Sequence, residues 1–123
     1  MGGGRPAYEA VGTGPAVRRG TAYWIDLGPF SPPEIGKTRP GVVVSNSIQN
    51  EHLGSLVIVP LSTLAPEIWP LRIEVKLKGL KTSYAVIPAI RQVSKARLRD
   101  QIGQLPDPLM ERIGEAIAVY LSD

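Results

Sequence analysis

KTRPGVVVS, residues 37–45, places Arg39 at the mouth of a short apolar run that follows a loop rich in Pro and Gly. A second apolar run, LVIVPL at residues 56–61, ends on the hydroxyl pair Ser62 and Thr63. Short apolar runs bounded by turn residues are typical of buried β-strands. We therefore expect two buried strands, one opening on a guanidinium and the other closing on a hydroxyl. Such a pair suits the handling of a phosphodiester.

Further runs of β-forming residues flank these two strands. The expected strands lie at residues 21–27, 40–45, 55–62, 71–77, 84–87 and 90–93, and residues 97–105 are ambiguous between strand and helix. The run at 71–77 alternates between apolar and polar residues, as in a half-exposed antiparallel strand. Residues 28–38 and the segment that holds Pro66 and Pro70 are expected to be loops, and 47–54 a polar connection.

The chain ends in a pattern that predicts a helix. Asp107 is a candidate N-cap, and Pro108 occupies the first helical position. The apolar residues that follow recur on one helical face, namely Leu109, Ile113, Ala116, Ile117, Tyr120 and Leu121. Many short strands before one terminal helix predict a mainly β fold, a small, strongly bent β-barrel capped by a helix.

Composition narrows the possible functions. A chain of 123 residues has room for one domain, which we place at 18–123, behind a Gly-rich flexible arm at 1–17. There is no cysteine and a single histidine, His52, so disulfides, zinc thiolates and multi-histidine metal sites are excluded. No apolar stretch approaches the ~20 residues that span a bilayer, and we expect a cytoplasmic protein without membrane contact.

The charge of the chain is divided unevenly. Residues 1–99 hold 13 Lys and Arg against 6 Asp and Glu, whereas residues 100–123 hold 1 against 5. One interpretation is an acidic, solvated helix behind a mildly basic domain. The other is a basic face that attracts a polyanion or an acidic protein segment. Charge alone leaves both open.

The side chains at the ends of the two apolar runs can bind a phosphate. Arg39 offers five donors in a fixed fork and stays protonated, so it suits a phosphate oxygen, and Ser62 and Thr63 each offer a hydroxyl donor. Taken singly, an arginine before a proline is usually surface, and a serine at a strand end usually satisfies backbone. We expect Trp24 to pack in the core, and Trp69, between prolines in a loop, to stack on a base or a partner.

Four motifs occur in an order that resembles a known family. They are Arg19-Gly20 with 24–27, residues 34–45 with the Arg39-Pro40 pair, residues 57–62, and residues 90–98. From Arg18 onward, over about 105 of the 123 residues, the chain resembles the MazF/PemK toxin endoribonucleases. The resemblance implies an SH3-like small β-barrel of the CcdB/MazF plasmid maintenance toxin type.

The resemblance also implies an activity. Such proteins are homodimers that cleave single-stranded RNA at specific sequences without metal or other cofactor. The ribose 2′-hydroxyl is the nucleophile, and the products carry a 2′,3′-cyclic phosphate and a 5′-hydroxyl. A cognate antitoxin protein neutralises the toxin, and DNA is contacted only through that antitoxin.

The family's functional positions transfer residue by residue. Its catalytic arginine falls on Arg39 and its catalytic hydroxyl on Ser62, with Thr63 and Glu34 as possible catalytic support. The expected RNA-binding residues are Lys37, Thr38, Trp69 and Arg91. A metal-free cleavage needs charge stabilisation at the phosphorane and a proton donor for the leaving oxygen. The general base stays unassigned.

The chain departs from the family pattern at three places. Ile35 and Ala89 stand where the family often has glutamine, and Ser62 stands where threonine is commoner. One alternative is therefore a catalytically degenerate barrel that binds RNA without cutting it. A CcdB-like gyrase-binding toxin ranks lower, because residues 120–123 lack the Trp-Gly-Ile ending of that class.

Overall fold

The computed structural model describes residues 16–29, 32–33 and 37–123. Its elements in chain order are β1 (Thr21–Asp26), β2 (Thr38–Val43), α1 (Ser47–His52), β3 (Ser55–Ser62), β4 (Arg72–Val75), β5 (Ser83–Val86), the 3-10 turn η2 (Ile87–Ala89), β6 (Arg91–Ser94), the 3-10 turn η3 (Lys95–Arg97), β7 (Leu98–Gln104) and α2 (Asp107–Tyr120). The prediction of a mainly β chain with a C-terminal helix is confirmed, and the ambiguous segment 97–105 is largely a strand.

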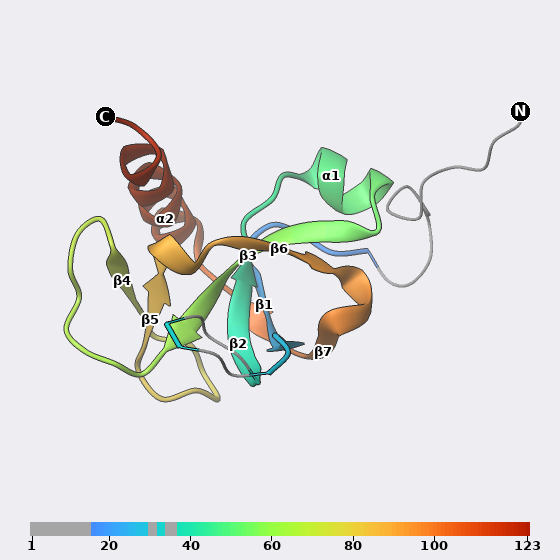
Figure 1. Ribbon diagram of the computed structural model, residues 1–123, viewed down its shortest axis with the longest axis horizontal. Helices are drawn as coiled ribbons and strands as arrows, with labels where there is room; N and C mark the ends of the chain where they lie inside the picture. Colours follow the sequence, from blue (N-terminus) through green and yellow to red (C-terminus); the bar gives the residue numbers. More distant parts are fainter. Residues whose placement is uncertain (1–15, 30–31, 34–36) are drawn as a thin grey trace, which may run out of the picture.

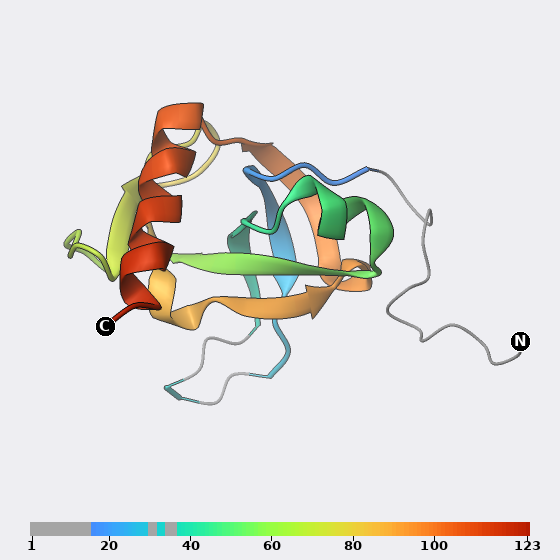
Figure 2. The ribbon, with the colours of Figure 1, turned by 90° about the horizontal axis from the view of Figure 1, so that it is seen from above.

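All strand pairs are antiparallel, in the order β4-β5-β3-β2-β1-β7, with β6 attached to β3. The long strand β3 is the centre of the sheet, since it pairs with β2, β5 and β6. Helix α2 packs at one end of the sheet and α1 lies at the other, with β3 and β6 running between them (Figures 1 and 2).

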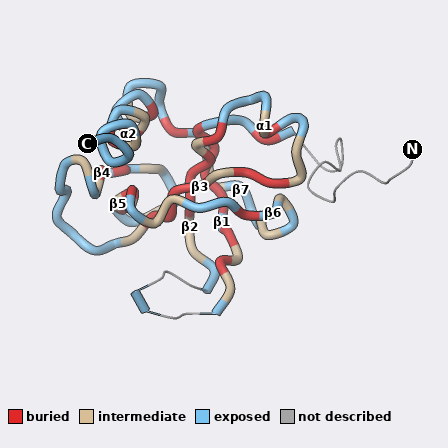
Figure 3. Tube along the Cα trace, turned by 45° about the horizontal axis from the view of Figure 1, so that its top comes forward, coloured by how far each residue is buried: buried red, intermediate tan, exposed pale blue. Residues whose placement is uncertain are grey.

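The central strands build a core on both of their faces. Successive strand residues point to opposite faces, so Val42 joins one apolar cluster and Val43 the other. The first cluster includes Val59, Leu61, Ile73 and, from α2, Ile113. The second cluster contains Val17, Tyr23, Ile25, Leu27, Val43, Leu56, Ile58 and Val93. Figure 3 shows the buried positions concentrated along β1, β2 and β3.

Two expectations about local structure are wrong. Residues 47–52 form α1 rather than a polar connection, because the Asn46 side chain caps the helix by accepting from Gln49 N at 3.0 Å and the buried Asn50 donates to Ser45 O at 2.9 Å. Trp24 is 37% exposed instead of core, although alternation places it on the same face of β1 as the buried Ala22. It pairs with Pro40 of β2 and belongs to neither apolar cluster, so the indole lies beyond the edge of the first cluster.

The terminal helix differs in detail from its prediction. It begins at Asp107, but Pro106 occupies the cap position and no side chain caps the helix, so Asp107 is not the N-cap. Met110, Ile113 and Ala116 are buried, whereas Tyr120 and Leu121 are 39% and 70% exposed because they lie at or beyond the helix end. None of the described helices is both long and apolar enough to cross a membrane.

Most of the predicted N-terminal arm, residues 1–15, lies outside the described residues. Ala16 is exposed, and Val17 packs into the second cluster. The boundary of the domain at Arg18 stays a prediction.

Candidate functional site

The pairing of β2 with β3 places the two predicted catalytic positions at neighbouring strand ends. Gly41 pairs with Pro60, and Val42 with Val59. The β2–β3 ladder ends at this Gly41–Pro60 pair, and Arg39 and Ser62 each lie two residues beyond it. Beyond that ladder, Arg39 pairs with Ile25 of β1 and Ser62 pairs with Tyr84 of β5, and both residues are partly exposed. The guanidinium and the hydroxyl therefore come from neighbouring strand ends on one face of the sheet.

The Ser62 hydroxyl is built into the start of the following loop. Its Oγ accepts a hydrogen bond from Leu64 N at 3.2 Å. This short turn fixes where the oxygen sits but leaves its proton available to donate elsewhere. The adjacent Thr63 is exposed.

The loop between β1 and β2 is closed at its neck by backbone contacts. Leu27 N donates to Lys37 O at 2.8 Å, and Lys37 N donates to Gly28 O. Gly28 and Lys37 both have left-handed backbone, with φ of 83° and 64°. That conformation is natural for glycine and uncommon for lysine. Lys37 and Thr38 are exposed beside this neck, while Glu34 and Ile35 lie outside the described residues.

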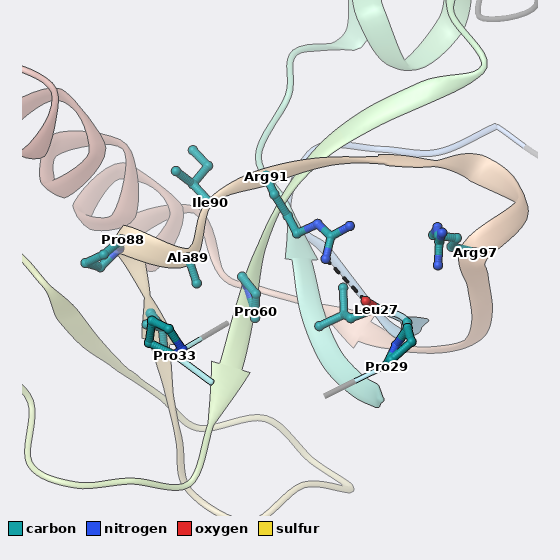
Figure 4. A pocket seen from close by; sticks show the side chains of 11 residues that line it. Leu27, Pro29, Pro33, Pro60, Pro88, Ala89, Ile90, Arg91 and Arg97 are labelled. Carbon is teal, nitrogen blue, oxygen red and sulfur yellow. Dashed lines mark hydrogen bonds between the residues drawn. The ribbon is translucent and has the colours of Figure 1, made fainter. Parts of the chain in front are cut away.

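A cavity of about 810 Å³ opens next to the neck. Its walls come from the β1–β2 loop, β3, η2 and β6, as Figure 4 shows. The lining residues are Leu27, Gly28, Pro29, Pro33, Pro60, Val86, Pro88, Ala89, Ile90, Arg91 and Arg97. Four prolines make a stiff apolar wall, and two arginines supply the charge. Such a space suits a flat apolar group attached to an anion.

Both cavity arginines are anchored on backbone oxygens. Arg91 Nη1 donates to Leu27 O at 3.3 Å, the contact drawn in Figure 4. Arg97 Nη1 donates to Asp26 O at 3.2 Å and lies 3.9 Å from Asp26 Oδ1. The other carboxylate oxygen of Asp26 binds Arg99 at 3.2 Å. A neutral carbonyl orients the Arg91 guanidinium without cancelling its charge.

A second cavity, of about 450 Å³, continues along β6 and shares both arginines. It is lined by Gly54, Ser55, Arg91, Gln92, Val93, Ser94 and Arg97. The two cavities thus border one cationic strip at Arg91 and Arg97. Arg91 was among the predicted RNA-binding residues, but Arg97 was not. The basic segment Lys95-Ala96-Arg97 was the signal available in the sequence, although nothing there indicated which cation faces the cavity.

Strand alternation connects the larger cavity to the predicted catalytic pair. Pro60 lines that cavity, and Ser62 is two residues further along the same strand. Positions 60 and 62 of β3 therefore share a face with positions 39 and 41 of β2. Arg39 and Ser62 lie beyond the Pro60 wall, and neither belongs to the lining of the cavity itself.

The remaining predicted RNA contact, Trp69, has a different surrounding. The guanidinium carbon of Arg112, on α2, lies 4.8 Å from the centre of the Trp69 ring. The ring is part of an exposed loop and lines neither of the two cavities. One of its faces is therefore engaged by the protein itself. Within the described residues, no three His, Asp or Glu side chains group as metal ligands would.

Comparison with known proteins identifies the family. The family model of PemK-like, MazF-like toxins of type II toxin-antitoxin systems matches residues 18–121. Endoribonuclease EndoA of Bacillus subtilis strain 168 is 29% identical over 110 residues, which cover 86% of this chain and 95% of the relative.

Solved structures agree with this assignment. An endoribonuclease from a Mycobacterial species, solved in complex with its cognate antitoxin, is 28% identical, with a TM-score of 0.69 over 86% of this chain and 93% of that one. MazF from Deinococcus radiodurans, at 17% identity, shares the fold with a TM-score of 0.75 over 88% and 98% of the two chains. The resemblance read from the sequence is confirmed, and the chain belongs to the PemK-like, MazF-like toxins of type II toxin-antitoxin systems.

Proposed function

We propose that this chain is an endoribonuclease toxin that cleaves single-stranded RNA at specific sequences, without a metal ion, in the cytoplasm. The observation that carries the proposal is the β2–β3 pairing, which places Arg39 and Ser62 two residues beyond the same end of the ladder, next to the Pro60 wall of a cavity with two arginines. Family membership and the names of the relatives support the same activity.

The proposed reaction is an in-line displacement within the RNA. The ribose 2′-hydroxyl gives up its proton as O2′ forms a bond to phosphorus, the bond from phosphorus to O5′ breaks, and O5′ leaves with a proton, so that no proton is gained or lost overall. Arg39 stabilises the charge on the phosphorane, because a guanidinium fork matches two phosphate oxygens. Ser62 donates a hydrogen bond to the reacting phosphate, with Thr63 and Glu34 as support. The products carry a 2′,3′-cyclic phosphate and a 5′-hydroxyl.

The cavity is the proposed place for the nucleotides beside the cut. A base fits against the proline wall, while Arg91 and Arg97 hold flanking phosphates. Lys37 and Thr38, exposed at the loop neck, add contacts to the sugar-phosphate backbone of the RNA. Ala89 leaves the wall without an amide at that point, which favours contact by shape over hydrogen bonding to the base edge.

Two further features belong to the proposal. A cognate antitoxin neutralises the toxin, which is supported by the relative solved in complex with its cognate antitoxin. In this proposal an acidic segment of the antitoxin covers the cationic strip, and DNA is reached only through that antitoxin. The toxin acts as a homodimer of SH3-like barrels. Closure of the barrel is supported by Leu77, whose Cδ1 would lie 3.5 Å from a Cβ built on Gly103 of β7.

The test is cleavage of a long RNA by the purified chain in EDTA, with mapping of the 5′ ends. We expect discrete cuts with 5′-hydroxyl ends that persist in EDTA and disappear in Arg39→Ala. Lys78→Ala, which removes an exposed charge that does not line the cavity, is the matched control and should cut normally. Intact RNA that shifts in a gel would instead indicate a degenerate RNA-binding barrel, a function that Ala89 in the cavity wall favours.

A further inference from the structure

The loop that follows Ser62 is fastened to helix α2 by one side chain. Arg112 Nη2 donates to Glu67 Oε2 at 3.2 Å, and the same guanidinium lies over the Trp69 ring, 4.8 Å from its centre. Arg112 is the sole Lys or Arg in residues 100–123. We call Arg112, Glu67 and Trp69 the Arg112 latch.

A chain of contacts leads from the latch back to the Ser62 hydroxyl. Glu67 also accepts from Glu74 N at 2.8 Å, so the loop is joined to β4 as well as to α2. Ile68 N donates to Arg72 O at 2.9 Å. Arg72 Nη1 donates to Leu64 O at 3.4 Å, and Leu64 N donates to Ser62 Oγ.

We infer that Arg112 is a positioning residue for the proposed cleavage, acting through the loop of residues 63–71 on the orientation of the Ser62 hydroxyl. The inference rests on the proposed function and adds to it a residue about 50 positions away in the sequence. Leu64, Ile68, Trp69 and Leu71 are exposed, so little apolar burial holds this loop in place. The latch supplies the fixation that burial does not.

A direct contact between Arg112 and an RNA phosphate is the competing role. The guanidinium already binds Glu67 and covers Trp69, and it lines neither cavity. The two roles make opposite predictions for Glu67→Gln. That substitution weakens the latch without removing a positive charge, so it impairs positioning but would favour phosphate binding.

The decisive experiment is a double-mutant cycle read by single-turnover cleavage of an RNA oligonucleotide. We expect Arg112→Ala and Glu67→Gln each to lower the maximal rate by about 3- to 10-fold, as for exposed ion pairs and cation–π contacts. The half-saturating concentration should stay within about twofold. The double variant should be no slower than the worse single variant, because both substitutions disrupt the same Arg112 latch.

Two controls separate positioning from simple loss of structure. Arg112→Lys keeps the ion pair but not the flat stack on Trp69, so it should restore part of the rate. Glu111→Ala, at the neighbouring exposed helix position, should cleave like the wild type. A raised half-saturating concentration in Arg112→Ala with normal cleavage by Glu67→Gln would overturn the inference.

A second readout does not depend on cleavage. The chain has two tryptophans, so Trp24→Phe leaves Trp69 as the reporter of the latch. In that background, Arg112→Ala and Glu67→Gln should change the intensity and wavelength of Trp69 emission, and Glu111→Ala should not. Unchanged emission would show that the latch is not formed. If the wild type cuts no RNA, the proposed function fails, and the emission still decides whether the latch exists.

Discussion

The two faces of strands β1, β2 and β3 are built from the same alternating sequence but end differently. The face under α2 carries the first apolar cluster, which is covered by Met110, Ile113 and Ala116 of that helix. The opposite face starts as a core around Ile25 and Ile58 and then opens into a cavity bordered by arginines. The first face stabilises the sheet, which lets the second keep unburied charge at the ends of its strands.

The largest effect that distinguishes the faces should come from one hydroxyl. We expect Ser62→Ala to lower the cleavage rate by about 10²- to 10³-fold, the range for the loss of one hydrogen-bond donor to the charge that develops in the transition state. The free energy of unfolding of the Ser62→Ala variant should differ from that of the wild type by less than about 1 kcal/mol, since Ser62 is partly exposed. Rate and urea denaturation measured on the same preparation give both numbers.

Ser62→Thr is the matched control, because it keeps the hydroxyl and adds only the methyl group that is common in the family. It should cut at a rate within about tenfold of the wild type. Full activity in Ser62→Ala would move the role to Thr63, and Thr63→Ala would then be the variant that fails.

The face under α2 should respond in the opposite way. Ile113 is fully buried, so Ile113→Ala should cost about 2–5 kcal/mol of unfolding free energy through lost burial and an unfilled cavity. The cleavage rate per folded molecule should stay near that of the wild type. Val119→Ala, at a position 47% exposed on the same helix, should cost less than about 1 kcal/mol. Equal losses in the two variants would show that α2 does not seal this face.

The sequence predicted the buried strands of these faces better than the features that depend on distant contacts. Periodicity predicted β3 at its observed bounds and placed β2 within two residues, because apolar burial decides both. Periodicity missed α1, which forms despite its polar composition because Asn46 caps it and Asn50 is buried. It also predicted a buried Trp24, because a run of β-forming residues does not show how far along the strand the core extends. Arg39 and Ser62 were proposed as site residues from their place at strand ends, and that role stays a prediction. Arg97 and the Arg112 latch were not, since both depend on contacts between segments distant in the chain.

The cationic strip provides a smaller effect on the open face. Arg91→Ala and Arg97→Ala should each weaken RNA binding several-fold, and each should reduce the slope of log affinity against log salt by about 0.7, as for one phosphate contact on a single strand. Lys81→Ala, an exposed lysine outside both cavities, should leave the slope unchanged. Filter binding at several salt concentrations measures this. A slope that responds equally to all three would mean that the strip is not the binding site.

The smallest effect concerns the closed part of that same face, where Tyr23 is 9% exposed in the second cluster. Burial raises the pKa of the Tyr23 phenol above its ordinary value of 10.0. Above about pH 10 the unfolded chain therefore loses this proton before the folded chain does, and the free energy of unfolding falls as the pH rises. Tyr23→Phe should remove that part of the alkaline loss.

Urea denaturation of wild type and Tyr23→Phe between pH 7 and pH 11.5 tests this expectation. The two unfolding free energies should differ by a constant amount up to about pH 9, within about 1.5 kcal/mol for so small a change of shape. Above pH 10 the wild type should lose stability faster than the variant. Parallel curves over the whole range would mean that water reaches the phenol. The second face would then be accessible to water at Tyr23 as well as at the cavity, unlike the face under α2.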